Sequence, residues 1–279
     1  MKWIKIIMVG ACVLAAVGVS YGGILYQQDF QSYSNGATGF IGSGNGWTGT
    51  GMTSGQTNSI GGVGSLFTAN TPSLRSLYVN DNITTNPLNQ TLIYSSTNSG
   101  ATSISNNGNV KISFDFNIRS NGAPGSAGVT PTFDLRAGNA WVATLNLGGT
   151  TNRYFQNFVT NASSISSVSV STANWYRIEM TIGDLSTATD TYNLKVWQAA
   201  PAGGYNQAGT LVVDLTNVAM RVNASYFDGF DFRTQSTNTA SLYNIDNISV
   251  VTIPEPATIG MLVFGAGGLV LIRRQLAGR

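Results

Sequence analysis

Apolar and polar residues alternate one by one along much of the chain between residues 23 and 252. In the clearest segment, residues 110–118, every second side chain is apolar and the side chains between them are polar. Because successive side chains of a β-strand point to opposite faces, this pattern predicts a strand with one buried face and one solvent face. The 3.6-residue period of an amphipathic helix is almost absent from the same region, so the pattern predicts strands throughout.

Similar alternation predicts further strands, separated by clusters of glycine, asparagine, serine and threonine that favour turns. About a dozen short strands of this kind predict an all-β sandwich. No linker rich in proline or charge divides residues 23–252, so one domain is expected, with long loops across residues 36–64. The stronger candidates are residues 133–137, 141–147 and 176–182, and the weaker ones are residues 25–30, 74–79, 91–94, 154–159, 165–170, 192–197, 211–215, 227–232 and 243–251.

The N-terminal segment has the composition of a secretory signal peptide. Lys2 and Lys5 precede an apolar run over residues 6–19, and small residues follow it. This order predicts a signal helix in residues 1–22, cleaved after Gly22 or Ser20. A retained anchor helix and lipidation at Cys12 are the alternatives. Cys12 is the only cysteine, so a chain cleaved at this point has no thiol and no disulfide.

The C-terminal segment, residues 253–279, has three parts. Pro254, Glu255 and Pro256 precede an apolar stretch over residues 257–272, and Arg273 and Arg274 follow it. The apolar stretch predicts a transmembrane helix about 24 Å long, slightly shorter than the roughly 30 Å hydrocarbon core. The paired arginines are expected on the cytoplasmic side.

This three-part tail resembles the PEP-CTERM sorting signal of Gram-negative bacteria that make exopolysaccharide. The resemblance implies recognition by an exosortase-type membrane protease and cleavage near Pro254, Glu255 and Pro256. It also implies an inner-membrane intermediate, followed by release or attachment at the cell surface or in the extracellular matrix. A plain C-terminal membrane anchor is the alternative.

The charge content of the chain is low. Charged residues make up 9%, against roughly 25% in an average soluble domain, and there are 33 glycines. Outside the terminal segments, 9 basic residues stand against 11 acidic ones, which gives a net charge near −2. This composition excludes nucleic-acid binding by a basic stripe and excludes a coiled coil.

A second resemblance concerns the body of the chain. The opening residues 28–33 with Gly46 and Trp47, the paired segments 175–179 and 192–196, and the closing residues 243–250 look like concanavalin A-like (laminin G/glucanase-type) domains. That family has an antiparallel jelly-roll β-sandwich, and many of its members bind sugars. The resemblance therefore implies a jelly roll and favours carbohydrate as the ligand class.

The residues that common hydrolases need are scarce. The chain has no histidine, which excludes Ser-His-Asp catalysis and imidazole zinc sites. Glu179 and Glu255 are the only glutamates, and no strand matches the Glu-x-Asp-x-x-Glu pattern of the related glucanases. We therefore expect a non-catalytic protein, with Glu179 as an ion-paired residue on a strand's solvent face.

Two kinds of binding site remain as hypotheses. Asp29, Asp246 and Asn247 carry oxygen ligands suited to a structural calcium ion, if the first and last strands adjoin. The alternative is a turn at Asp29 and a bulge at Asp246; no other cofactor is predicted.

Sugar stacking is the second hypothesis. Trp197 lies opposite the apolar face of its strand, and Trp47 lies in a glycine-rich segment, so both are candidate platforms. Packing under a loop is the alternative for each, and Trp141 and Trp175 are expected in the core.

These observations together predict an exported, non-catalytic β-sandwich protein that is sorted to the cell surface and associates with extracellular polysaccharide. The alternatives are a structural surface or biofilm protein without a defined ligand, and a carbohydrate-active enzyme.

Overall fold

The computed structural model describes residues 23–34, 47–50, 57–61, 64–68, 75–81, 89–95, 108–121, 130–147, 154–157, 163–185, 190–235 and 241–253. The predicted signal helix, the Pro254–Glu255–Pro256 motif, Arg273, Arg274 and the predicted membrane helix lie outside these residues. Among the described residues, none belongs to a helix long and apolar enough to span a bilayer.

The chain divides into two compact units, residues 24–251 and the two terminal segments together. Of the terminal unit, residues 23, 252 and 253 are described. In it, the backbone N–H of Thr252 donates to the carbonyl of Gly23 at 2.9 Å.

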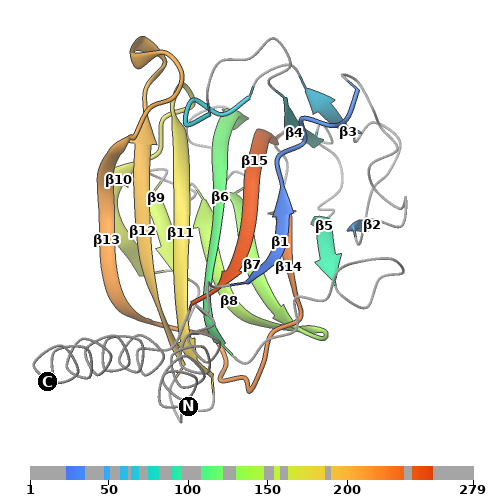
Figure 1. Cartoon of the computed structure of the whole chain (residues 1–279), viewed down its shortest axis with the longest axis vertical. Coiled ribbons are helices and arrows are strands. Elements are labelled where there is room, and N and C mark those ends of the chain that lie inside the picture. The colour runs from blue at the N-terminus through green and yellow to red at the C-terminus, as the bar shows by residue number, and fades with distance from the viewer. Residues whose placement is uncertain are drawn as a thin grey trace, which may run out of the picture. The chain divides into compact units, whose positions relative to one another are not determined.

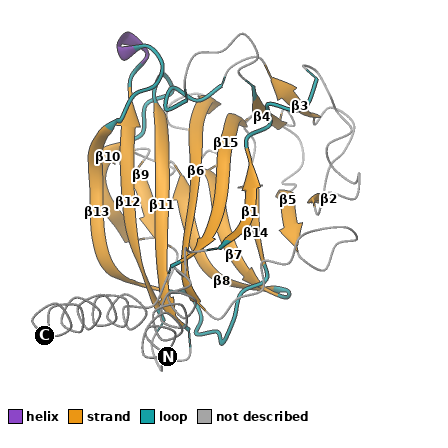
Figure 2. Ribbon diagram, viewed as in Figure 1, coloured by secondary structure: helices purple, strands orange, loops and turns teal. Residues whose placement is uncertain are grey.

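The unit formed by residues 24–251 consists almost entirely of antiparallel strands (Figures 1 and 2). The strands are β1 (Ile24–Gln28), β2 (Trp47–Thr50), β3 (Thr57–Gly61), β4 (Ser76–Asp81), β5 (Asn89–Ser95), β6 (Gly108–Asn121), β7 (Thr130–Ala137), β8 (Ala140–Leu147), β9 (Tyr154–Asn157), β10 (Ser163–Ser169), β11 (Trp175–Asp184), β12 (Thr191–Ala199), β13 (Thr210–Ala219), β14 (Gly229–Gln235) and β15 (Ser241–Thr252).

These strands form two sheets. The eight-stranded sheet has the order β13-β12-β11-β6-β15-β4-β3, and β1 also pairs with β15. The seven-stranded sheet has the order β10-β9-β8-β7-β14-β5-β2. The prediction of an all-β, antiparallel architecture is confirmed for the described residues.

Every predicted strand segment overlaps an observed strand; for example, residues 110–118 lie within β6. The expectation of loops throughout residues 36–64 is wrong, because β2 and β3 lie there. β2 pairs with β5, and β3 pairs with β4, each at an edge of its sheet. Backbone pairing with a neighbouring strand therefore forms these two short strands, although their sequences lack apolar alternation.

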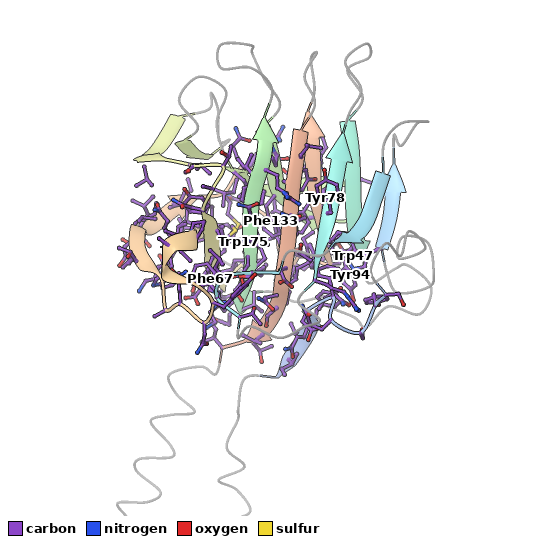
Figure 3. The ribbon with its side chains drawn as sticks, turned by 90° about the horizontal axis from the view of Figure 1, so that it is seen from above. Trp47, Phe67, Tyr78, Tyr94, Phe133 and Trp175 are labelled. Carbon is purple, nitrogen blue, oxygen red and sulfur yellow. The ribbon has the colours of Figure 1, made fainter. Side chains whose placement is uncertain are left out.

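The core lies between the two sheets, which face each other with the apolar side chains of the alternating strands (Figure 3). Phe114 of β6 contacts Phe133 of β7, with ring centroids 4.8 Å apart, and meets Phe232 of β14 edge to face at 5.1 Å. Because the inward positions are apolar, the polar residues between them lie on the two outer faces. On one of these faces Glu179 pairs with Lys111 at 3.2 Å, as the sequence predicts.

Candidate functional site

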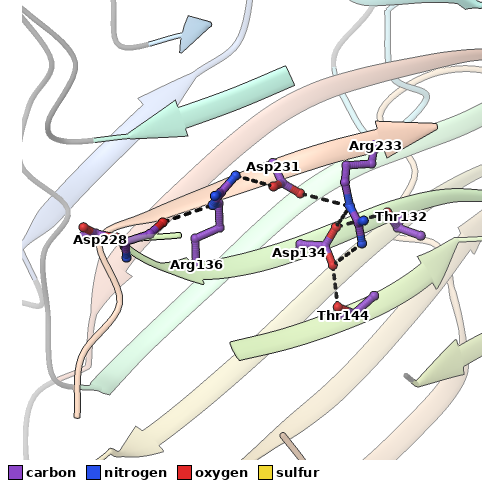
Figure 4. A network of polar contacts seen from close by, with 8 residues as sticks. Thr132, Asp134, Arg136, Thr144, Asp228, Asp231 and Arg233 are labelled. Carbon is purple, nitrogen blue, oxygen red and sulfur yellow. Dashed lines mark hydrogen bonds and ion pairs between the residues drawn. The ribbon is translucent and has the colours of Figure 1, made fainter. Parts of the chain in front are cut away.

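The seven-stranded sheet carries a network of ion pairs on its outer face, built from one short motif that occurs twice (Figure 4). β7 contains Asp134-x-Arg136 and β14 contains Asp231-x-Arg233, and the strands run antiparallel with Asp134 opposite Asp231. In this register each arginine lies diagonally across from the aspartate of the other strand, within reach of a long side chain. The two motifs therefore pair with each other.

The first diagonal pair is fully buried. Arg233 donates from Nε and Nη2 to the two carboxylate oxygens of Asp134, at 2.5 and 3.0 Å. The hydroxyls of Thr132 and Thr144 also donate to this carboxylate. Bidentate geometry and the added hydroxyl donors compensate for the loss of water around both charges.

The second diagonal pair continues the network toward the turn between β7 and β8. Arg136 Nη1 lies 3.0 Å from Asp231 Oδ2, and Arg136 Nε donates to the carbonyl of Gly138 at 3.3 Å. Asp231 Oδ1 has no hydrogen-bond donor among the described residues and lies 3.7 Å from Arg233 Nε. Burial, followed by the charge of Asp134, raises the pKa of Asp231 to about 8, although both guanidiniums oppose the shift.

Trp141 lies on the same outer face, where the sequence pattern does not predict it. Leu135 pairs with Ala143 but Arg136 pairs with Trp141, so Val142 is an extra residue in β8. This β-bulge reverses the face of the residue before it, and Val142 joins the core in place of Trp141. The expectation that Trp141 is a core residue is therefore wrong.

Two guanidiniums lie over the Trp141 ring. The Arg233 guanidinium carbon is 4.0 Å from the ring centroid, and that of Arg221 is 5.1 Å away. Arg233 is buried and Arg221 is exposed. The ring therefore joins the buried network to an exposed cation through cation–π contacts.

The segment after β13 completes an exposed edge beside Trp141. The backbone N–H groups of Arg221 and Val222 donate to the carbonyl of Val142, at 2.8 and 3.2 Å. Val222 is 49% exposed and Tyr226 is 43% exposed, and the Tyr226 hydroxyl lies beside Gly138. We call Arg136, Trp141, Arg221, Val222 and Tyr226 the cationic rim.

The outer face of the eight-stranded sheet has its own Arg–Asp pair. Arg177 of β11 donates from Nε and Nη2 to the carboxylate of Asp115 on β6, at 2.7 and 2.9 Å. The Asn247 side-chain amide donates to Asp115 at 2.6 Å and to the Thr68 hydroxyl at 2.7 Å. Asn247 has a left-handed backbone conformation, with φ of 50°. This pair is thereby tied to β15 and to the segment 64–68.

Asp246 is the buried carboxyl of this second cluster. Its oxygens accept the backbone N–H of Ser65 at 3.0 Å and that of Asn247 at 2.8 Å. Burial is the main cause that raises its pKa to about 8; the nearby charges of Asp115 and Asp29 raise it further, and the two N–H donors oppose this.

Residues 64–68, which we call the strap, cover this face. Asn206 N–H donates to the Thr68 carbonyl at 2.9 Å, and Gln207 N–H donates to the Leu66 carbonyl at 3.0 Å. The apolar side chains of the strap form a small cluster with residues of β11 and β12; Phe67 and Trp175 are labelled in Figure 3. Its members are Leu66, Phe67, Trp175, Ala199 and the half-buried Trp197.

Trp197 points to the outer face, as the alternation in its strand predicts, and the strap covers part of it. Gly209, with φ of 78°, is packed so closely that a Cβ there would lie 2.6 Å from Phe67 and 3.0 Å from the Cβ of Trp197. Trp175 is buried as expected, in the cluster formed with the strap.

The prediction that Trp47 is a second sugar platform is wrong. Its side chain is 1% exposed in the core, its indole N–H donates to the Tyr26 hydroxyl at 2.8 Å, and its ring meets Phe230 edge to face. Because β2 pairs with β5, the Trp47 side chain points inward and packs in the apolar core between the sheets.

The predicted calcium ligands come only partly together. Asp246 and Asn247 share one cluster, and Asp29 lies near enough for its charge to raise the pKa of Asp246, but the Asp29 side chain accepts the backbone N–H of Gln31 at 3.1 Å, as a turn former does. Within the described part of the chain, no group of three acidic, histidine or cysteine side chains is placed to hold a metal ion. The calcium hypothesis gains no support from this arrangement.

Comparisons with known proteins give distant structural likenesses. No known family matches the chain, and no curated protein does. An alginate lyase of family PL-14 from Aplysia kurodai is 12% identical, with a TM-score of 0.49 over 82% of this chain and 99% of that one. The alginate lyase Aly36B, as a mutant with an alginate trisaccharide, is 13% identical, with a TM-score of 0.47 over 83% and 100%.

A sialidase is 12% identical with a TM-score of 0.49 over 81% of this chain, which spans only 18% of the sialidase. All of these TM-scores are below 0.5, so the two-sheet architecture rests on the strand pairing of this chain alone.

Proposed function

We propose that this protein is exported, sorted to the cell surface, and binds extracellular polysaccharide through the cationic rim. The observation that carries the binding proposal is the exposed Arg221 over the half-buried Trp141 ring, with the exposed Tyr226 beside Gly138 of the adjoining β7–β8 turn. Flat aromatic rings stack on sugar rings, and guanidinium N–H groups donate to sugar oxygens. We also propose that the two sheets form a concanavalin A-like jelly roll, as the resemblance of the sequence implies.

The buried network supports a binding role for the rim. Arg233 lies between Asp134 and the Trp141 ring, so the ring stacks on a side chain that is itself held by two hydrogen bonds. A platform fixed in this way loses little conformational freedom when a ligand binds. The geometry therefore suits a preformed contact surface.

The same network argues against glycoside hydrolysis. Glycoside hydrolysis requires two carboxyl groups that reach the scissile bond. Asp134 and Asp231 form a pair of carboxyls, but both are fully buried and are paired with Arg233 and Arg136. Neither one faces the solvent side where a polysaccharide chain would lie.

The proposal of export and sorting is supported by the sequence at both ends. Residues 1–22 have the order of a signal peptide, and the Pro254–Glu255–Pro256 tail resembles the PEP-CTERM signal. We propose an exosortase-type protease as the processing partner and the inner membrane as the intermediate site.

One experiment on the producing cells tests both the binding proposal and the sorting proposal. The full-length chain is expressed with Trp141→Ala, with Tyr205→Ala on an exposed loop as the matched control, and with Pro254, Glu255 and Pro256 replaced by alanine. Trp141→Ala should reach the surface at the mature mass but bind the cell's own polysaccharide about 10- to 100-fold more weakly, the range of about 1–3 kcal/mol for hot-spot residues. The tail variant should stay in the membrane unprocessed.

Tyr205→Ala should resemble the parent in both measurements. Binding that is unchanged in Trp141→Ala would overturn the assignment of the rim, and a normal surface mass in the tail variant would overturn the sorting proposal.

A further inference from the structure

Arg221 differs from the other guanidiniums of the rim and its network. Arg136 and Arg233 each have a carboxylate partner, whereas Arg221 is exposed and has no carboxylate within ion-pair distance among the described residues. Among the described residues, the Arg221 guanidinium carbon lies 5.1 Å from the centroid of the Trp141 ring. A guanidinium held over an aromatic ring without a counter-ion is available to an anion from solution.

Both charged side chains of the rim, Arg136 and Arg221, are guanidiniums, which donate hydrogen bonds and cannot accept them. The carboxylates of Asp134 and Asp231 lie buried beneath the rim, and Asp228 accepts the backbone N–H of Gly138 at 2.9 Å. Of the rim's side chains, Arg221, Val222 and Tyr226 are exposed and Trp141 is half-buried. A guanidinium only donates and a carboxylate only accepts, so the exposed charge of the rim matches a carboxylate better than a sugar hydroxyl, which does both.

We propose that the rim recognises an acidic polysaccharide, with a sugar carboxylate bound by Arg221 where it lies over the Trp141 ring, and the neighbouring sugar ring against the exposed Tyr226. The inference deepens the proposed function and rests on it. The planar fork of a guanidinium matches a carboxylate with two parallel hydrogen bonds. The body of the chain has a net charge near −2, from 9 basic and 11 acidic residues, so general charge does not attract a polyanion. Selectivity for an acidic polysaccharide must therefore come from the local charge at Arg221.

The test uses polygalacturonate and its fully methyl-esterified form, which has the same sugar backbone without the charge. The full-length protein should bind polygalacturonate at least tenfold more tightly than the ester, and the difference should shrink as salt is raised. Arg221→Ala should remove the difference, and Arg221→Lys should keep part of it. Because Arg221 is exposed, these variants should melt as the parent does.

Lys195→Ala is the matched control, since Lys195 is an exposed cation on the eight-stranded sheet. It removes the same charge and should leave the preference for polygalacturonate intact. Equal loss in Lys195→Ala and Arg221→Ala, or equal binding of the two polymers by the parent, would overturn the inference while the proposed function stands. If neither polymer nor the cell's own polysaccharide binds, the proposed function fails, and the inference fails with it.

Discussion

The two outer faces of the sandwich contain the same local chemistry and differ in what covers it. Each has a bidentate Arg–Asp pair, Arg233–Asp134 on the seven-stranded sheet and Arg177–Asp115 on the eight-stranded sheet. Each also has a second buried carboxyl with a pKa raised to about 8, Asp231 on one sheet and Asp246 on the other. An Arg–Asp pair on a strand face is therefore not by itself evidence of a binding site.

The partners of the second carboxyl distinguish the faces. Asp246 accepts backbone N–H groups of the strap and of β15, so its partners join two parts of the chain. Asp231 has side-chain partners, and its network leads through Trp141 to Arg221, which has no carboxylate partner in the part of the chain that the structure describes. On the eight-stranded sheet the cluster connects two parts of the chain. On the seven-stranded sheet the network ends in exposed groups that a ligand can reach.

The largest expected effect comes from breaking the more deeply buried pair. Arg233→Ala leaves the carboxylate of Asp134 buried without its cation, which should lower the free energy of unfolding by about 3–5 kcal/mol. Arg177→Ala should cost less, about 1–3 kcal/mol, because Arg177 is 38% exposed and Asn247 still donates to Asp115. Urea unfolding of both variants measures this difference.

Lys195→Ala serves as the control here, since the exposed Lys195–Asp214 pair at 3.9 Å should contribute at most about 0.5 kcal/mol. A loss in Arg177→Ala that equals or exceeds the loss in Arg233→Ala would contradict the distinction between the faces.

The pH dependence of stability gives the next effect. Asp231 and Asp246 each have a folded pKa of about 8, above the value of 3.8 for an ordinary aspartate, so the folded state binds more protons than the unfolded state between these values. Their stabilising contribution is complete below about pH 4 and is lost as the pH rises through 8. We expect each of the two carboxyls to lower the free energy of unfolding by about 2 kcal/mol from pH 6 to pH 8.

Asp246→Asn and Asp231→Asn should each remove about half of this pH dependence, because the two carboxyls have the same folded pKa of about 8. Stability that is level or rises over this interval in the parent would refute the assignment of both carboxyls.

The smallest effect concerns Trp197, which the sequence suggests as a sugar platform. Because the strap covers part of its ring, Trp197→Ala should lower the free energy of unfolding by about 1–2 kcal/mol, less than a fully buried tryptophan costs. Its binding to the cell's polysaccharide should stay unchanged. A variant with parental stability and lost binding would move the binding site to the eight-stranded sheet.

Most of the strands could be predicted from the sequence because alternation is a local signal. Alternation identifies β6 and β11 because every second residue in them is apolar. It fails at Trp141 because the bulge at Val142 moves the Trp141 side chain to the other face of the sheet. The paired Asp-x-Arg motifs are visible in the sequence, yet their partnership depends on β7 lying beside β14, and Asp134 and Arg233 are 99 positions apart. The contact of Ser65 with Asp246 spans 181 residues and has no local signal at all.

The position of β15 has a consequence for the order in which the chain folds. This last strand of the sandwich lies inside the eight-stranded sheet, between β6 and β4, and it is also the strand with which β1 pairs. A chain made from its N-terminus therefore cannot complete this sheet until residues 241–252 have emerged, and β1 has to wait through the synthesis of more than two hundred residues. Such long-range closure slows folding and leaves strand edges open to aggregation. The eight-stranded sheet is therefore incomplete without its final strand, and a chain that ends before β15 should fail to fold.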